Sequence, residues 1–253
     1  VVILHTNNIM AQPRFFGSEL LGGHLNNFNV GVDFFFVLSG FIIAWVHWAD
    51  IGDRSRIGNY ATKRFLRIYP PYWGILVPLI ALYLVFPGAG VPSQHDPLNI
   101  ILSIFLVPYT SQPVLGVAWT LTHEIFFYLL FGVILLLGKR ALVVLPVWAV
   151  AITAANLGGS LDYPLSFFLS PFNLGFIMGV SAALLLRRHT VPMPRLLLVA
   201  SVAIFVGIMV FGGSIQDNSL VARIAFGIPA MCFVLAAVEI DRTSPLRVPR
   251  IAL

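Results

Sequence analysis

The sequence predicts an all-α protein that crosses a membrane about eight times, and three observations lead to this fold class. Hydrophobic residues make up 58% of the 253 residues and charged residues only 10%, with a mean hydropathy of +0.92. A water-soluble domain of this length could not bury so much apolar surface. The apolar residues occur in runs long enough to cross a bilayer, where backbone polar groups must be paired within helices. We expect one integral membrane helix bundle over residues 1–253, without an internal repeat or a second domain.

The spans are predicted from apolar runs that alternate with polar or proline-rich connections. Eight runs are expected to cross: residues 1–10, 30–48, 72–86, 118–138, 141–157, 171–186, 196–211 and 220–239. The first run looks like the second half of a span and the chain starts without Met, so we expect a fragment, truncated at both ends. The run 72–86 is short unless residues 68–73 lie in the interface, where aromatic residues are at home.

A further apolar segment, residues 98–107, is predicted to enter the membrane without crossing it. Asp96 can cap a helix whose first residue is Pro97. Pro108 and Pro113 end this helix after about ten residues, which is half the thickness of a bilayer. The loop before it is expected to cover residues 87–94.

The distribution of positive charge favours this arrangement. If residues 98–107 do not cross, all but two of the 15 Lys and Arg residues, Arg14 and Arg223, lie on one side of the membrane. If they do cross, the bias disappears. The positive-inside rule therefore predicts that the basic turn, residues 54–67, is cytoplasmic.

Charge, cysteine and histidine content exclude several other classes. The net charge of +5 does not indicate a nucleic-acid partner, because the basic residues lie in short turns between apolar runs. The lone Cys232 cannot form an internal disulfide. The histidines have no metal-ligand spacing, so no metal is expected. The sequence also has no glycine-rich phosphate-binding loop.

Asp33 and Ser39 are the first polar residues of interest, because both lie inside the apolar run 30–48. An unpaired charge in hydrocarbon costs about 3 kcal/mol or more, so Asp33 should face a partner or a watery cavity. Both residues could serve helix packing or function, and the sequence leaves this open.

His5 and Glu124 are candidates for chemistry within the membrane. A histidine titrates near neutrality, which suits a general base; a buried neutral histidine bonded to a neighbouring helix is the alternative. Glu124 lies about 9 Å into its span, and Tyr128 and Thr120 share its helical face. His5 is predicted about 8 Å below the same outer face, so we expect it to contact Glu124 directly or through one water. A purely structural buried carboxylate is the alternative for Glu124.

Arg64 and Arg67 are the candidates for ligand binding in the basic turn. At i and i+3 they share one face of any helix, and two guanidinium groups so placed can grip phosphates. They could instead be topology charges that bind anionic lipid. The remaining histidines are expected to be solvated or interfacial, although His123 could tune its neighbour Glu124; these are His24, His47, His95, His123 and His189.

Three motifs in this order resemble the membrane-bound acyltransferase-3 family, and most of all its exopolysaccharide-acetylating branch. They are the Gly-Val-Asp-x-Phe-Phe-x-x-Ser-Gly-Phe run from Gly31, the Arg-x-x-Arg-x-Tyr-Pro run from Arg64 and the Trp-Thr-Leu-Thr-His-Glu run from Trp119. The similarity runs from His5 to about Tyr128. It implies an enzyme of the inner cell membrane that moves an acyl group from acyl-CoA, expected to be acetyl-CoA, to a carbohydrate hydroxyl of a surface or exported polysaccharide. Its partners would be membrane lipid, acyl-CoA and carbohydrate, without nucleic acid.

The resemblance also implies roles for particular residues. His5 falls where the family has its proposed catalytic histidine, and Glu124 would orient it or stabilise its charged form. Arg64 and Arg67, assisted by Lys63, would hold the nucleotide end of the acyl donor. Ile125 departs from the Glu or Met that is commoner in the family. An Arg-containing start before the histidine and a last span with a Ser-Tyr, Tyr and His pattern are not found in this sequence.

A transporter or flippase is the alternative from another functional class. Intramembrane Asp, Glu and His residues also build proton and substrate paths. This alternative accounts for Asp33, Glu124 and His5 but gives the paired arginines no specific role.

Overall fold

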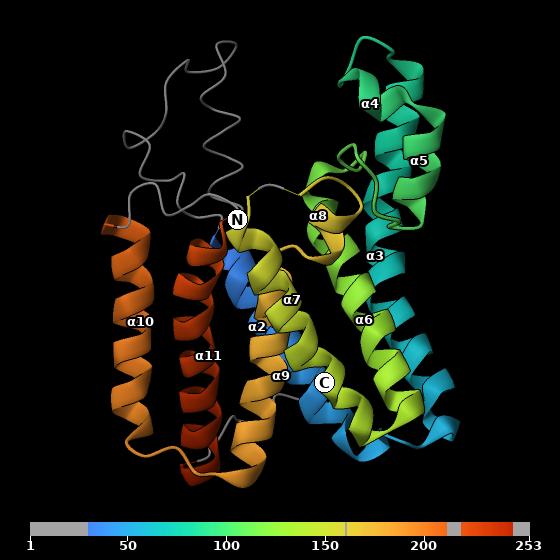
Figure 1. The fold of residues 1–253 in the computed structure, drawn as a ribbon. Helices are drawn as coiled ribbons and strands as arrows, with labels where there is room; N and C mark the ends of the chain where they lie inside the picture. Colours follow the sequence, from blue (N-terminus) through green and yellow to red (C-terminus); the bar gives the residue numbers. More distant parts are fainter. Residues whose placement is uncertain (1–29, 160, 212–218, 245–253) are drawn as a thin grey trace, which may run out of the picture. The chain divides into compact units, whose positions relative to one another are not determined.

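The computed structural model describes residues 30–159, 161–211 and 219–244 (Figure 1). All regular elements in these ranges are helices, which confirms the predicted fold class. Seven helical stretches within the same ranges are long and apolar enough to cross a membrane: Gly31–Asp50, Arg54–Val85, Gly116–Leu137, Lys139–Leu157, Leu165–Arg188, Pro194–Phe211 and Leu220–Thr243. They match seven of the eight predicted spans. The eighth, residues 1–10, lies outside the described residues.

The chain divides into two compact units, and each is considered by itself. The first comprises residues 1–46 and 174–253, and the second comprises residues 47–173. The helices of the first unit are α2 (Gly31–His47), α9 (Asn173–Arg188), α10 (Pro194–Phe211) and α11 (Leu220–Thr243). Those of the second are α3 (Ile57–Val85), α4 (Pro92–His95), α5 (Pro97–Ile104), α6 (Trp119–Leu137), α7 (Val144–Leu157) and α8 (Leu165–Phe168). Short 3₁₀ turns at Trp48–Asp50, Arg54–Arg56, Gly116–Ala118 and Lys139–Val143 also belong to it.

Small residues let α2 and α9 approach closely in the first unit. A Cβ atom added at Gly40 or Gly179 would collide with the backbone of the facing helix, at Phe176 and Val37 respectively. Beside these contacts the rings of Phe36 and Phe176 lie 4.5 Å apart. Without water to drive association inside a bilayer, such close backbone packing is a main source of helix adhesion.

Charged contacts at both ends of the first unit fix the direction of its helices. Asp33, in the first turn of α2, pairs with Arg223, in the first turn of α11. At the other end, Arg187 of α9 donates from Nη2 to the carbonyl of Trp45 at 2.7 Å, and the guanidinium of Arg242 lies 4.9 Å from the Trp45 ring. Helices α2, α9 and α11 are therefore parallel. An odd number of crossings must separate α2 from α9, which supports the expectation that the segment around α5 does not cross.

Helix α3 corrects the predicted basic turn. Residues 54–67 were expected to form a turn before a span starting at Tyr72, whereas one helix of 29 residues runs from Ile57 to Val85 and contains Pro70, Pro71 and Pro78. Proline interrupts the backbone hydrogen bonds of a helix, but neighbouring groups can compensate in a membrane protein. At 1.5 Å per residue, α3 is about 43 Å long, so it exceeds the hydrocarbon core and its basic first turns can project into water.

The turn before α3 is closed by Asp53. Its carboxylate accepts hydrogen bonds from the backbone N–H of Ser55 at 3.0 Å and from the Ser55 hydroxyl at 2.6 Å. These hydrogen bonds from Ser55 lower the pKa of the exposed Asp53 carboxyl. The residue therefore stays ionised beside Arg56, whose Nε lies 3.6 Å away.

Helix α5 is the short segment predicted not to cross, and it is not among the seven candidate spans of the described residues. The side chain of Asp96 accepts from the backbone N–H of Leu98 at 3.1 Å, which confirms the predicted cap. The predicted loop 87–94 is partly wrong, because α4 begins at Pro92.

Three aromatic side chains of α3 hold the other end of α5. The Tyr72 hydroxyl donates to the carbonyl of Ser103 at 2.7 Å, the Trp73 indole to that of Ile104 at 2.9 Å, and the Tyr69 hydroxyl to that of Phe105 at 3.0 Å. A helix leaves its last carbonyls without intrahelical donors. These three donors satisfy them, so α5 can end within the protein.

Candidate active site

Glu124 lies in the second turn of α6 and is 2% exposed. The Tyr128 hydroxyl, one turn further along the helix, donates a short hydrogen bond to Glu124 Oε1. This confirms the expected i, i+4 neighbour. Thr120 behaves differently, because its hydroxyl donates to the carbonyl of Val117 at 3.1 Å. The Tyr128 hydroxyl, and not that of Thr120, therefore orients the Glu124 carboxylate.

Arg64 of α3 packs against the same tyrosine. Its guanidinium carbon lies 5.4 Å from the centre of the Tyr128 ring and 5.9 Å from that of Tyr60, within the range of cation–π attraction. Tyr60 also ties the two helices together, since its hydroxyl donates to the Tyr128 carbonyl at 2.8 Å. The arginine is therefore half-buried, in contrast to a freely moving surface charge.

His47 extends this arrangement and corrects a prediction, because it is buried, although it was expected to be solvated or interfacial. Its Nε2 lies 3.1 Å from Arg64 Nη2, and its Nδ1 lies 2.8 Å from Asp50 Oδ2. A guanidinium can only donate, so Nε2 must accept and Nδ1 carries the hydrogen that is donated to Asp50. A neutral imidazole, itself oriented by a carboxylate, thereby holds the Arg64 side chain.

We call these five residues the polar chain: Asp50, His47, Arg64, Tyr128 and Glu124. Sequence reasoning identified the last three and missed the contribution of His47 and of the adjacent Tyr60. Two spacings could have indicated it, since His47 precedes Asp50 by three residues and Tyr60 precedes Arg64 by four, each about one helical turn.

Lys63 and Arg67 complete the basic face of α3. Both side chains are exposed, and no hydrogen bond or ion pair joins either to another described residue. Arg64 and Arg67 thus differ: one is held by aromatic rings and a histidine, and the other is available to a ligand in water.

Asp33 and Ser39 lie in the first unit, so their position relative to the polar chain is not defined. Asp33 is buried and accepts from Arg223 Nη1 at 2.7 Å, which confirms the expectation of a partner. Ser39 is also buried, within α2. The ion pair favours the structural interpretation of Asp33.

The remaining histidines differ in their surroundings. His5 and His24 lie outside the described residues, so the predicted contact between His5 and Glu124 stays a prediction. His95 bonds to the carbonyl of Ala89 at 2.7 Å, and His189 is exposed. His123 is buried rather than interfacial. No metal-binding group of three or more His, Cys, Asp or Glu occurs within the described ranges.

His123 is held in one tautomer by Asn173. Its Nδ1 lies 3.0 Å from Asn173 Oδ1, while Asn173 Nδ2 donates to the carbonyl of Phe167 at 3.1 Å. Because Oδ1 can only accept, Nδ1 of His123 carries the hydrogen. The imidazole ring also stacks on Phe167, with centroids 4.4 Å apart.

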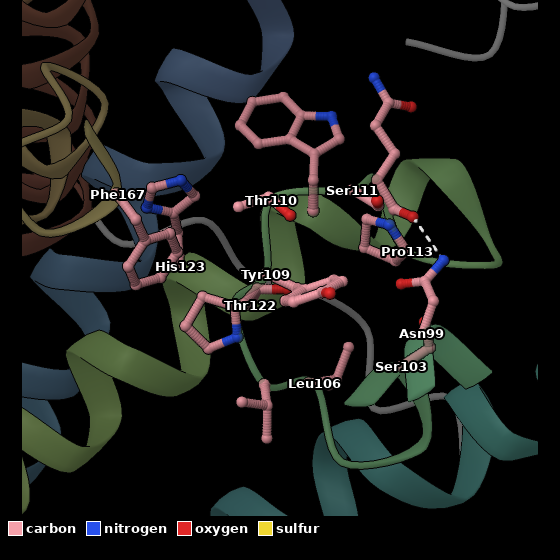
Figure 2. Close-up of a pocket in the computed structure, with 14 residues that line it drawn as sticks. Asn99, Ser103, Leu106, Tyr109, Thr110, Ser111, Pro113, Thr122, His123 and Phe167 are labelled. Carbon is pink, nitrogen blue, oxygen red and sulfur yellow. Dashed lines mark hydrogen bonds between the residues drawn. The ribbon is translucent and has the colours of Figure 1, made fainter. Parts of the chain in front are cut away.

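His123 lines a cavity of about 170 Å³ that sequence reasoning did not identify (Figure 2). Residues of α5, of the connection 105–113, of the first turn of α6 and Phe167 of α8 enclose it. Figure 2 shows His123 and Phe167 on one side, Asn99 and Pro113 on the other, and Tyr109 between them. The polar and aromatic residues between Pro108 and Pro113 could have indicated a cavity here. We refer to this space as the polar cavity.

Comparisons with known proteins agree with the resemblance. A family model described as an acyltransferase domain, that of the acyltransferase-3 family, matches residues 1–252. The match therefore extends well beyond the first half of the chain, to which the motifs had pointed. No solved structure matches.

Two curated relatives are similar to parts of the chain. The exopolysaccharide production protein ExoZ of Rhizobium meliloti (strain 1021) is 32% identical over 179 residues, which is 66% of this chain and 53% of the relative. The acyltransferase MdmB of Streptomyces mycarofaciens is 28% identical over 134 residues, which is 48% of this chain and 33% of the relative. The matched regions thus cover about half of the first relative and a third of the second. With seven apolar helices among its described residues and a family match over nearly its whole length, the chain is a membrane protein that belongs to the acyltransferase-3 family.

Proposed function

We propose that the protein transfers an acetyl group from acetyl-CoA to a carbohydrate hydroxyl of an exported polysaccharide, in the inner cell membrane. The observation that carries this proposal is the polar chain, which connects a held arginine on α3 to a buried carboxylate on α6 through Tyr128. Arg64 is suited to bind phosphate, and Glu124 is suited to take part in proton transfer. The similarity to an exopolysaccharide production protein supports a polysaccharide acceptor.

The donor would bind on the basic face of α3. Arg64 and Arg67 share this face at i and i+3, and Lys63 lies beside them. Guanidinium groups bind phosphate with two hydrogen bonds each, and the phosphates of CoA offer several acceptors. The charge distribution predicts that this end of α3 is cytoplasmic, which is where acetyl-CoA is available.

The chemistry would take place near Glu124. A sugar hydroxyl is a weak nucleophile at neutral pH, so a base must remove its proton as it attacks the thioester carbonyl. His5 is proposed as this base, and Glu124 would stabilise the imidazolium that forms. Collapse of the tetrahedral intermediate breaks the carbon–sulfur bond, and the proton on His5 passes to the departing CoA thiolate. The products are an O-acetyl ester and free CoA.

The experiment that tests this function uses the full-length protein in detergent or nanodiscs. It would be incubated with [¹⁴C]acetyl-CoA and a polysaccharide whose O-acetyl groups have been removed by mild alkali. We expect label in the polysaccharide that mild alkali releases, one free CoA per acetyl transferred, and loss of transfer in His5→Ala. Absence of transfer from acetyl-CoA and from longer acyl-CoA donors would refute the proposed function.

A further inference from the structure

The polar cavity contains groups that neither the motifs nor the proposed donor site uses. Aromatic rings and neutral polar side chains both line it, and none of its lining residues is charged. A site for CoA phosphates would require cations, and a site for an acyl chain would be apolar throughout. Aromatic faces combined with hydroxyl and amide groups suit a neutral ligand that has both C–H faces and hydroxyls. A sugar ring is such a ligand.

The walls of the cavity are held in place by hydrogen bonds. Asn99 is 1% exposed, and its Nδ2 donates to the carbonyls of Ser93 at 2.7 Å and Gln112 at 3.0 Å. The Ser103 hydroxyl accepts from the backbone N–H of Val114 at 3.0 Å. These contacts fix the connection 105–113 against α5, so the cavity exists before any ligand enters. A preformed site loses little entropy on binding.

Several side chains of this connection are available to a ligand. Tyr109 is 37% exposed, and Thr110 and Gln112 are exposed. Their side chains make no hydrogen bond to any other described residue. The volume of about 170 Å³ is below the range of about 300–1,000 Å³ for drug-sized ligands. The cavity therefore has room for one ring of a saccharide, with the rest of a polymer outside.

The position of the cavity on α6 connects it to the proposed chemistry. Thr122 and His123 line it, and Glu124 is the next residue of the same helix. Lys139 and Arg140 follow the opposite end of α6, so the positive-inside rule puts the cavity end at the non-cytoplasmic face. An exported polysaccharide would reach this face, whereas acetyl-CoA would approach from the other.

We infer that the polar cavity is the acceptor subsite and binds one sugar ring of the polysaccharide at the depth of Glu124 along α6. This inference rests on the proposed acetyl transfer and adds where the acceptor binds.

The test separates acceptor binding from donor binding. The full-length protein would be assayed with acetyl-CoA and oligosaccharides cut from alkali-treated exopolysaccharide. Tyr109→Ala removes an exposed ring, and Thr110→Trp fills the cavity with little risk to the fold. We expect each to raise the KM for the oligosaccharide at least tenfold. The KM for acetyl-CoA should change less than twofold.

Tyr83→Ala is the matched control, because Tyr83 is a half-buried tyrosine of the same unit that does not line the cavity. Its KM values should equal those of the unmodified protein. Unchanged KM for the oligosaccharide in both cavity variants, or a rise in the KM for acetyl-CoA instead, would overturn the acceptor subsite while leaving the proposed function intact. Failure of the unmodified protein to transfer acetyl groups would overturn the proposed function itself.

Discussion

Each of the two units buries a carboxylate in an apolar helix, but they stabilise it differently. In the first unit, Asp33 and Arg223 form an ion pair at 2.7 Å with side chains only 5% and 2% exposed. In the second, Glu124 accepts from the neutral hydroxyl of Tyr128, and the Arg64 guanidinium lies over the tyrosine ring. A matched ion pair fixes both partners in one arrangement. The carboxylate that accepts from Tyr128 is the one proposed to stabilise a charge that forms beside it, such as an imidazolium.

The largest expected effect concerns the ion pair. Removing one partner breaks a buried ion pair, so Arg223→Ala or Asp33→Asn should reduce stability by about 3–5 kcal/mol. The double variant Asp33→Asn/Arg223→Gln should recover most of this loss. Thermal unfolding in detergent measures both. If the stable double variant loses acetyl transfer, Asp33 has a functional role and the contrast between the units is wrong.

Glu124→Gln should reduce turnover without reducing stability, unlike the ion-pair variants. The amide cannot stabilise an imidazolium, so turnover should fall about 10²-fold, or about 2.7 kcal/mol, while the thermal unfolding temperature stays close to that of the unmodified protein. Tyr128→Phe, which removes only the orienting hydroxyl, is the matched comparison and should lose less. Full turnover in Glu124→Gln would assign the carboxylate a structural role like that of Asp33.

These contrasts show what could be predicted from sequence. The fold class and seven spans followed from hydropathy, because the lack of water in the bilayer leaves few alternatives to helices. Residues at short helical spacing, such as Glu124 and Tyr128, could also be paired in advance. Continuation of α3 through Pro70 and Pro71 could not, because it depends on compensating contacts that no local pattern encodes.

Contacts between residues far apart in the sequence could not be predicted either. Asp33 needed a partner, but Arg223 is 190 residues away and was identified only as a minority charge on one side of the membrane. The burial of His47 and His123 was missed because both lie near the ends of apolar runs. Their surroundings come from other elements, namely Arg64 of α3 and Phe167 of α8.

A smaller effect is expected at the donor site. Arg64→Ala or Arg67→Ala should raise the KM for acetyl-CoA about 10- to 100-fold, as each removes a charged phosphate contact worth about 1.5–3 kcal/mol. Lysine at either position should restore the affinity for acetyl-CoA only in part, because it lacks the bidentate geometry. Isothermal titration with CoA gives the affinity directly. Unchanged affinity in both alanine variants would make these arginines lipid anchors.

The smallest effect is expected for His47, which acts through Arg64. His47→Ala should raise the KM for acetyl-CoA about 3- to 10-fold with little change in kcat, and His47→Gln should restore part of it, since its amide oxygen can accept from the guanidinium. In an Arg64→Ala background, His47→Ala should add nothing, because the two effects share one contact. Additive losses would show that His47 stabilises the fold independently of the arginine.

The three hydrogen bonds between α3 and the end of α5 have a further consequence. Tyr69, Tyr72 and Trp73 follow Arg67 within two turns, and they hold the helix that forms one wall of the polar cavity. Pro70 and Pro71 lie among these three residues and remove backbone hydrogen bonds from α3, so the contacts with α5 also support α3 where its own hydrogen bonding is weakest. If any one of the three donors were removed, a carbonyl at the end of α5 would lose its partner and the cavity wall would lose part of its support.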